Sequence, residues 1–208
     1  MLTDWLPFAY FLLFLIVAVF WRAYQVWKQT SVNALTSYHT EGVYGLSSIL
    51  FRLVFVGIGI VTIANVIPSA ATFLTPLDWL EHEILRWLGW VILLTSLFIV
   101  IVAQINMGSA WRIGVDTSQK TTLITNGVFQ YSRNPIFLAI RMCFFGLLLV
   151  LPTAWSLMLW ALGDAMIQVQ VRLEEQYLFE TFGEQYQRYF ESVRRWIGVQ
   201  SPPNRAST

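Results

Sequence analysis

Four long stretches of this chain contain no charged side chain, and they constrain its fold more than any other feature. They are residues 7–21, 53–67, 87–105 and 142–163. A transmembrane α-helix needs about 20 predominantly apolar residues to cross the hydrocarbon core of a bilayer. Only 12% of the 208 residues are charged, against roughly 25% in an average soluble domain. The sequence therefore predicts an integral membrane protein.

The apolar stretches are separated as individual membrane helices would be. We expect an all-α, polytopic membrane protein with about five transmembrane helices, at residues 6–27, 46–67, 84–105, 135–151 and 153–171. The last two are joined across Pro152, so we expect them to form a tight helical hairpin. Four glycines inside the spans indicate close helix packing: Gly57, Gly59, Gly146 and Gly163.

A different pattern follows the last span. Apolar residues recur at steps of three and four from Leu178 to Trp196, and charged and amide side chains occupy the other face. This spacing predicts a C-terminal amphipathic helix, with Gly183 as a point where it could kink. We expect the helix to lie on the membrane surface or to cover the other helices.

Basic side chains are concentrated on one side of the predicted topology. Segments 28–45, 106–134 and 172–208 carry most of the lysines and arginines, whereas segment 68–83 carries none. Because basic loops tend to stay in the cytoplasm, this predicts an outside N-terminus and an inside C-terminus. Arg86, at the outer end of the third span, is the exception. The two large polar segments on either side of the hairpin then face the cytoplasm, and we expect them to meet in space.

Two charged residues lie inside the predicted hairpin. Arg141 precedes Pro152 by 11 residues, and Asp164 follows it by 12, so the two helices would carry them at nearly the same depth. Charged groups inside a membrane span are costly unless they are paired. We therefore expect an ion pair that fixes the register of the hairpin. The alternative is that Arg141 extends to a lipid headgroup.

The chain shows no pattern typical of a metal site. Its single cysteine, Cys143, lies inside an apolar run, and its two histidines, His39 and His82, lie in separate polar segments. We also see no signature of nucleic-acid binding.

Polar residues suited to chemistry lie immediately before and after the hairpin. Before it, Pro135 suits the first turn of a helix and Asn134 suits its N-cap, but Arg133 is not needed for capping. After it, Glu174 and Glu175 are either ordinary charges at a membrane boundary or partners for Arg133 or for a bound cation. Neighbours on a helix point about 100° apart, so at most one of the two carboxylates can face a given pocket.

These two regions resemble the sequence elements of one enzyme superfamily, in the same order. Residues 123–137, Leu-Ile-Thr-Asn-Gly-Val-Phe-Gln-Tyr-Ser-Arg-Asn-Pro-Ile-Phe, resemble its first element. Residues 174–196, which begin Glu-Glu-Gln-Tyr-Leu and end Val-Arg-Arg-Trp, resemble its second. The superfamily is that of the isoprenylcysteine carboxyl methyltransferases and phospholipid methyltransferases. The resemblance spans Met107 to Ile197 and implies a membrane enzyme that transfers a methyl group from S-adenosyl-L-methionine.

The resemblance also implies which residues bind the cofactor, on the cytosolic side. Carried over by position, the residues that line it are Thr122, Leu123, Ile124, Phe129, Asn134, Pro135, Ile136 and Phe137. Glu174 would take the α-ammonium group. Arg133 would pair with the carboxylate of the cofactor or with an acidic acceptor, because a cation beside a helix N-terminus makes an anion site. Arg133, Asn134 and Glu175 are the catalytic candidates.

The chain departs from the superfamily pattern at several positions. Asn134 stands where a histidine is usual, and phenylalanines stand at 129 and 137 where tyrosines are usual. Asparagine can donate hydrogen bonds but does not titrate as histidine does. Any proton-handling role of that histidine would therefore be absent here.

We thus expect an S-adenosylmethionine-dependent membrane methyltransferase with a lipophilic acceptor, an isoprenoid or prenylcysteine-type carboxylate being one candidate. Two alternatives stay open: an NADPH-dependent membrane reductase similar to the steroid reductases, and a non-catalytic membrane scaffold. The expected organisation is transmembrane helices 1–3 in residues 1–105, a cofactor-binding catalytic region in 106–200 and a loose tail in 201–208. The expected partners are a lipid acceptor and membrane lipids, with no metal and no nucleic acid.

Overall fold

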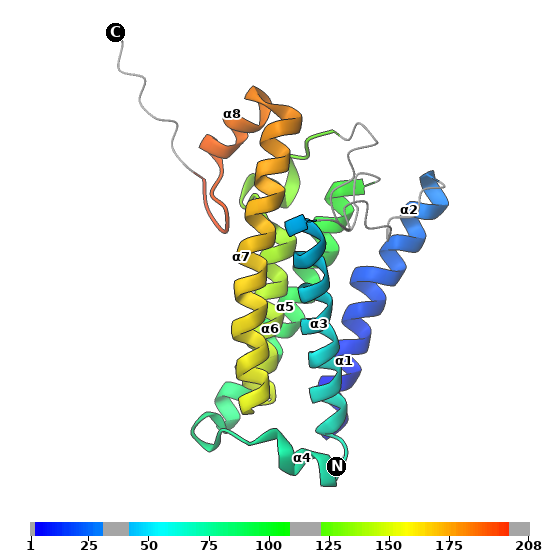
Figure 1. Ribbon diagram of the computed structural model, residues 1–208, viewed down its shortest axis with the longest axis vertical. Helices are drawn as coiled ribbons and strands as arrows, with labels where there is room; N and C mark the ends of the chain where they lie inside the picture. The colour runs from blue at the N-terminus through cyan, green and yellow to red at the C-terminus, as the bar shows by residue number, and fades with distance from the viewer. Residues whose placement is uncertain (1–2, 31–41, 109–121, 200–208) are drawn as a thin grey trace.

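The computed structural model describes residues 3–30, 42–108 and 122–199, and within them the chain is a bundle of helices with no β-strand (Figure 1). The all-α prediction is confirmed. The predicted tail at 201–208 lies outside the described residues, as do His39, Arg112 and Lys120. The helices are α1 (Leu6–Leu15), α2 (Arg22–Thr30), α3 (Gly42–Ala64), α4 (Pro68–Ala71), α5 (Glu83–Met107), α6 (Pro135–Val150), α7 (Ala154–Phe182) and α8 (Glu184–Ser192). A π-helical segment, Ile16–Trp21, joins α1 to α2 in one continuous rod.

Three helical stretches are long and apolar enough to cross a membrane: Leu6–Gln29, Gly45–Ala64 and Glu83–Met107. Helix α6 is also apolar but shorter. The first three predicted spans are therefore confirmed as helices, and the chain is a multi-pass membrane protein.

The outer surface of α5 shows why the chain needs lipid around it. On one face Leu93 and Val100 are buried against the bundle, while on the other Val91, Leu94 and Phe98 are 59%, 60% and 66% exposed. Large apolar side chains in a continuous row are unfavourable in water. They are stable when acyl chains cover them.

The end of the second span was predicted three residues too late. Helix α3 ends at Ala64 and not at residue 67, and Ile67 is extended, with φ −97° and ψ 109°. The cause is Pro68, whose ring disfavours the helical conformation in the residue before it.

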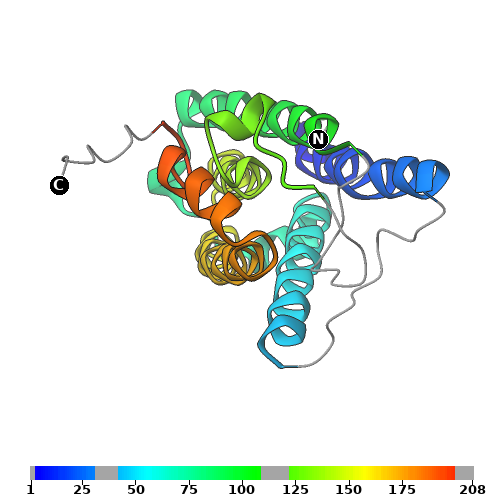
Figure 2. The same ribbon diagram turned by 90° about the horizontal axis from the view of Figure 1, so that it is seen from above.

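Helix α6 lies at the centre of the bundle, between α5 and α7 and beneath α8 (Figure 2). Glycines allow this close approach. A Cβ atom added to Gly146 would lie 3.0 Å from the side chain of Leu93 and 3.1 Å from the carbonyl oxygen of Gly89. A Cβ added to Gly163 would lie 2.4 Å from the ring of Phe144. The predicted role of glycine in packing is confirmed at these positions, as it is at Gly57 and Gly59.

The predicted hairpin between α6 and α7 is also confirmed. The side chain of Thr153 caps α7 by accepting a hydrogen bond from the backbone N–H of Ser156, at 3.1 Å. The segment before α5 pairs with the hairpin tip, since Leu77 N donates to Pro152 O at 2.8 Å and Ala154 N donates to Thr75 O at 2.9 Å. The tip is therefore held by backbone hydrogen bonds on both sides.

The predicted C-terminal amphipathic helix is present as α8, which buries Tyr186 and Tyr189, but its predicted bounds of Leu178 to Trp196 are wrong. Helix α7 continues without a break to Phe182, and α8 covers only Glu184–Ser192. The break lies at Gly183, whose φ of 50° is strained for other residues. The expected kink is thus a complete helix end, and α8 runs across the end of the bundle beyond it (Figure 2).

The predicted ion pair in the hairpin is present. Arg141 Nε lies 2.5 Å from Asp164 Oδ1, and the two side chains are 29% and 30% exposed. The guanidinium also lies 4.4 Å from the ring centroid of Trp196. The pair therefore joins α6 to α7 and to the C-terminal segment.

We expect the Asp164→Asn variant to be destabilised because it leaves the Arg141 cation unpaired at membrane depth. The double variant Arg141→Gln/Asp164→Asn should recover part of this loss, with a coupling energy of about 1 kcal/mol. Thermal unfolding of the wild type, both single variants and the double variant in detergent measures it. Strictly additive effects would show that the two side chains are adjacent but not coupled.

Candidate functional site

The segment before α6 is anchored to the end of α5. Gly127 has φ 60° and begins a short 3₁₀ turn, Gly127–Gln130. The next residue, Val128, donates its backbone N–H to Asn106 Oδ1 at 2.9 Å. This bond fixes the direction from which the chain enters α6.

Asn134 occupies the N-cap position of α6, as predicted, but its side chain does not cap the helix. Its Nδ2 instead donates to Glu175 Oε1 on α7, at 3.2 Å. Pro135 fills the first helical position, where its missing N–H leaves no bond unmade. The asparagine therefore joins two helices.

Arg133 is buried and its donors are largely used within the protein. Its Nε and Nη2 donate to Glu175 Oε1 at 3.3 and 3.1 Å. Its Nη1 donates to the backbone oxygens of Phe190 and Val193, and the guanidinium lies 4.0 Å from the ring centroid of Phe190. Arg133, which the helix cap does not need, thus joins the start of α6 to α7 and α8.

A second arginine completes the contact. Arg195 Nη2 lies 2.6 Å from Glu175 Oε2, and Arg195 Nε donates to the same oxygen at 3.1 Å. We call Arg133, Glu175 and Arg195 the carboxylate clamp. Its carboxylate is only 4% exposed, and it is surrounded by donors on both oxygens. Glu175 raises the pKa of Arg195 through their hydrogen bond.

Backbone hydrogen bonds extend the clamp. Arg133 N donates to Arg194 O at 3.0 Å, and Gly198 N donates to Tyr131 O at 2.8 Å. Ser132 Oγ donates to Arg195 O at 3.2 Å. The described parts of the two polar segments therefore meet in space, as the sequence predicted.

Glu174 differs from Glu175 in its surroundings. It is partly buried, and no described residue donates a hydrogen bond to it or forms an ion pair with it. One turn earlier on the same face of α7, Gln170 accepts a hydrogen bond from Ser47 Oγ of α3 at 2.7 Å. Burial raises the pKa of Glu174 to about 7, and the charge of Glu175 adds to this. The two carboxylates thus face different partners, as their helical spacing required.

The other predicted cofactor residues lie around the start of α6. Leu123, Ile124 and Ile136 pack partly buried against a cluster that includes Phe129. Phe137 packs against the central core. Thr122 is exposed at the first described residue after 121. The structure thus brings most of these residues together, without showing what they bind.

Two buried tyrosines of α8, Tyr186 and Tyr189, differ in their hydrogen bonding. Tyr189 donates its hydroxyl to Phe129 O at 2.6 Å. The Tyr186 hydroxyl is buried and has no hydrogen-bond partner among the described residues. Charges of Glu175, Arg133 and Glu174 act on it, and burial raises its pKa. Tyr186 and Arg195 are the site residues that sequence reasoning missed; the motif Val-Arg-Arg-Trp was the available signal for Arg195.

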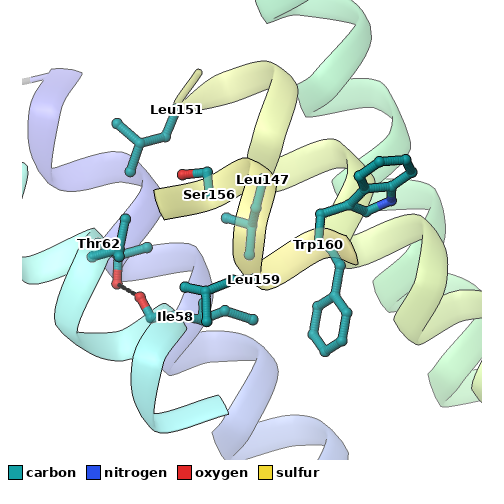
Figure 3. Close-up of a pocket in the computed structure, with 9 residues that line it drawn as sticks. Ile58, Thr62, Leu147, Leu151, Ser156, Leu159 and Trp160 are labelled. Carbon is teal, nitrogen blue, oxygen red and sulfur yellow. Dashed lines mark hydrogen bonds between the residues drawn. The ribbon is translucent and has the colours of Figure 1, made fainter. Parts of the chain in front are cut away.

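A cavity lies at the opposite end of the bundle, between α3, α6 and α7 near the hairpin tip (Figure 3). Its lining is mostly apolar, with Thr62 and Ser156 as the polar residues, and the hydroxyl of Thr62 is turned back to Ile58 O at 2.9 Å. It measures about 20 Å³, which is room for about one water molecule. The cavity is therefore no match for a nucleoside cofactor.

The two tyrosines generate a stability prediction. Tyr189→Phe should lower the free energy of unfolding by about 1 kcal/mol, because Phe129 O would be left buried without its donor. Tyr186→Phe should leave it unchanged or raise it, because it removes a buried hydroxyl without a partner. Thermal unfolding in detergent measures both. A larger loss for Tyr186→Phe would mean that its hydroxyl is satisfied in the fold.

Comparison with known proteins supports methyl transfer. Residues 84–185, about half of the chain, match the family model described as phospholipid methyltransferase. The match runs from α5 to the first turn of α8 and contains Arg133, Glu174 and Glu175. No curated protein matches the chain. The family match favours methyl transfer over the reductase and scaffold alternatives. The chain is therefore a member of the phospholipid methyltransferase family, and with it a multi-pass membrane methyltransferase that uses S-adenosylmethionine.

Proposed function

We propose that the chain methylates a lipophilic acceptor at the end of the bundle that carries α8. The observation that carries this proposal is the difference between the two glutamates. Glu175 closes the carboxylate clamp, whereas Glu174, one residue before it, has no partner among the described residues. A free carboxylate beside a closed clamp suits a cationic ligand, and S-adenosylmethionine carries both an ammonium and a sulfonium group.

In this proposal Glu174 binds the α-ammonium group of the cofactor. The residues carried over from the superfamily line the rest of it: Thr122, Leu123, Ile124, Phe129, Asn134, Pro135, Ile136 and Phe137. A sulfonium donor is already activated, so the protein has chiefly to align the methyl group with the acceptor. The chain supplies this alignment by fixing the entry to α6.

We propose positioning roles for the three catalytic candidates. Arg133 donates to Glu175, Phe190 and Val193, so it holds α8 and the segment after it and does not have to bind the cofactor carboxylate. Asn134 orients Glu175. Glu175 accepts hydrogen bonds from two guanidinium groups, so both of its oxygens are occupied by partners within the protein. The free hydroxyl of Tyr186 is a candidate donor to the cofactor carboxylate instead.

The finer topology is also a proposal. Five crossings require α6 and the apolar part of α7 to span the membrane, and an odd number puts the two termini on opposite sides; we propose that the N-terminus is outside and the C-terminus inside. The distribution of basic residues supports this orientation. We propose that the catalytic region comprises residues 106–200 together with α5, because α5 and α6 pack through Gly89 and Gly146. We propose the acceptor only at the level of its chemical class, a lipophilic molecule. An isoprenoid carboxylate is one candidate.

Binding of S-adenosylhomocysteine tests the role of Glu174. The Glu174→Gln variant should bind it at least about tenfold more weakly, because a charge-assisted hydrogen bond contributes roughly 1.5–3 kcal/mol. Glu180→Gln, which neutralises an exposed carboxylate on the same helix, is the matched control and should bind as the wild type does. Calorimetry in detergent measures the affinities, and thermal unfolding checks that both variants fold. Equal affinity in both variants would remove Glu174 from the site.

The pH dependence follows from the raised pKa of Glu174. Its carboxyl has a pKa of about 7, so roughly a tenth of it is ionised at pH 6 and roughly nine-tenths at pH 8. Because the ammonium group binds the ionised carboxylate, the affinity for S-adenosylhomocysteine should rise several-fold between pH 6 and pH 8. In Glu174→Gln this pH dependence should be lost.

Stability without ligand should run in the opposite direction. The folded state holds the Glu174 proton more tightly than the unfolded state does. Its contribution to stability is therefore complete below about pH 4.5 and is lost as the pH rises through about 7. Comparing the pH profiles of thermal unfolding in the wild type and in Glu174→Gln separates this effect from ligand binding.

A further inference from the structure

Arg22 is a buried cation without an acidic partner among the described residues. The residue is 6% exposed. Its Nη1 donates to Gln25 Oε1 at 3.0 Å and its Nη2 donates to Gly108 O. Its Nε is buried and has no acceptor among the described residues, and none of the ion pairs within these parts of the chain includes it. The guanidinium therefore has neutral partners for two nitrogens and none for the third.

The position of Arg22 is fixed by three elements. It begins α2, directly after the π-helical segment Ile16–Trp21. Gln104 of α5 holds that segment by donating to Ala18 O at 2.6 Å. The next residue in the chain, Ala23, is buried in a small cluster packed against Met107 and Ile136. The guanidinium thus lies where the first helix, the end of α5 and the first turn of α6 meet.

This junction lies at the same end of the bundle as the carboxylate clamp, but on the opposite side of α6. Figure 1 shows α2 and α8 at the same end, and Figure 2 shows them on opposite sides of α6. The guanidinium therefore lies apart from the carboxylate clamp, although Ile136 packs at this junction and also belongs to the proposed cofactor lining.

Neutral partners do not balance a buried guanidinium. The C-terminus of α5 carries a partial negative charge of about half an elementary charge, so Gly108 O compensates it in part. Removal from water still disfavours a charge that has no counter-ion. An arginine with a free N–H matches the oxygens of a phosphate. At the end of a membrane helix, lipid headgroups supply that group.

We infer that Arg22 binds the phosphate of a membrane lipid at the junction of α2, α5 and α6. The lipid lies with its phosphate at the guanidinium and its acyl chains along the apolar outer surface of the first helix, where Phe20 and Trp21 are 59% and 56% exposed. The site goes beyond the proposed function, because it does not require that the bound lipid be the methyl acceptor.

The test uses the full-length protein in a neutral sugar detergent, with thermal unfolding as the readout. Three probes are added separately: dioleoyl phosphatidylglycerol, dioleoylglycerol and inorganic phosphate. The variants are Arg22→Gln, Arg22→Lys and, as a matched control, Lys28→Gln, which removes one exposed charge from the same helix. Each variant is compared with itself without probe, so a change in its basal stability does not enter the result.

Phosphatidylglycerol should raise the Tm of the wild type and of Lys28→Gln by several degrees more than dioleoylglycerol does. The half-maximal lipid concentration should be at least tenfold higher in Arg22→Gln and intermediate in Arg22→Lys. If Arg22→Gln does not fold, the test is the comparison of Arg22→Lys with Lys28→Gln. The half-maximal lipid concentration should then be higher in Arg22→Lys.

Equal shifts in Arg22→Gln and the wild type, or equal shifts from the two lipids, would overturn the inference. If inorganic phosphate raises the Tm as much as phosphatidylglycerol does, and this depends on Arg22, the site binds phosphate. The inference that a lipid supplies the phosphate would then be overturned. S-adenosylhomocysteine binding is measured on the same samples. A wild type that does not bind it would end the proposed function of the cofactor site and leave the lipid result standing.

Discussion

The contact between Glu175 and two arginines is the interaction on which the rest of the site depends. The carboxylate belongs to α7, Arg133 to the entry of α6 and Arg195 to the segment after α8. Removing one partner of a buried ion pair leaves a charge without compensation, which is far more unfavourable than an exposed pair is favourable. The clamp therefore requires the full length of α7, the turn at Gly183 and the return of the chain along residues 193–198.

The sequence predicted the helices well because the membrane imposes a simple rule on length and polarity. Residues without charge over about 20 positions can form little else in a bilayer, and the hairpin and the Arg141–Asp164 pair follow from counting along it. Helix ends were predicted less well because they depend on single residues. Pro68 ended α3 early, and Gly183 divided a continuous apolar pattern into two helices. A glycine in a sequence does not reveal whether it will be helical or have a positive φ.

The sequence suggested which residues could belong to the candidate site, but not which of them would contact one another. Helical spacing required that Glu174 and Glu175 point in different directions, but it could not say which one would meet Arg133. That choice depends on the rotation of α7 against α6, which is set by packing at Gly163 and Phe144. Arg195 could not be assigned because its position depends on the chain reversal after Ser192. Asn134 was expected to cap α6, whereas its side chain bridges to Glu175 of α7.

Hydrogen bonding is distributed unevenly along the described parts of the bundle, and this asymmetry has a physical reason. Polar groups deep in the spans are satisfied internally: Tyr10 donates to Leu93 O at 2.7 Å, and Thr62 donates to Ile58 O. In hydrocarbon an unsatisfied polar group costs several kcal/mol, so none can be held in reserve there. The buried atoms without partners, Arg22 Nε and the Tyr186 hydroxyl, both lie near the α8 end of the bundle. At a membrane surface such donors can be satisfied by polar ligands from the water or the headgroup layer, so their position supports the proposal that ligands bind at this end of the bundle.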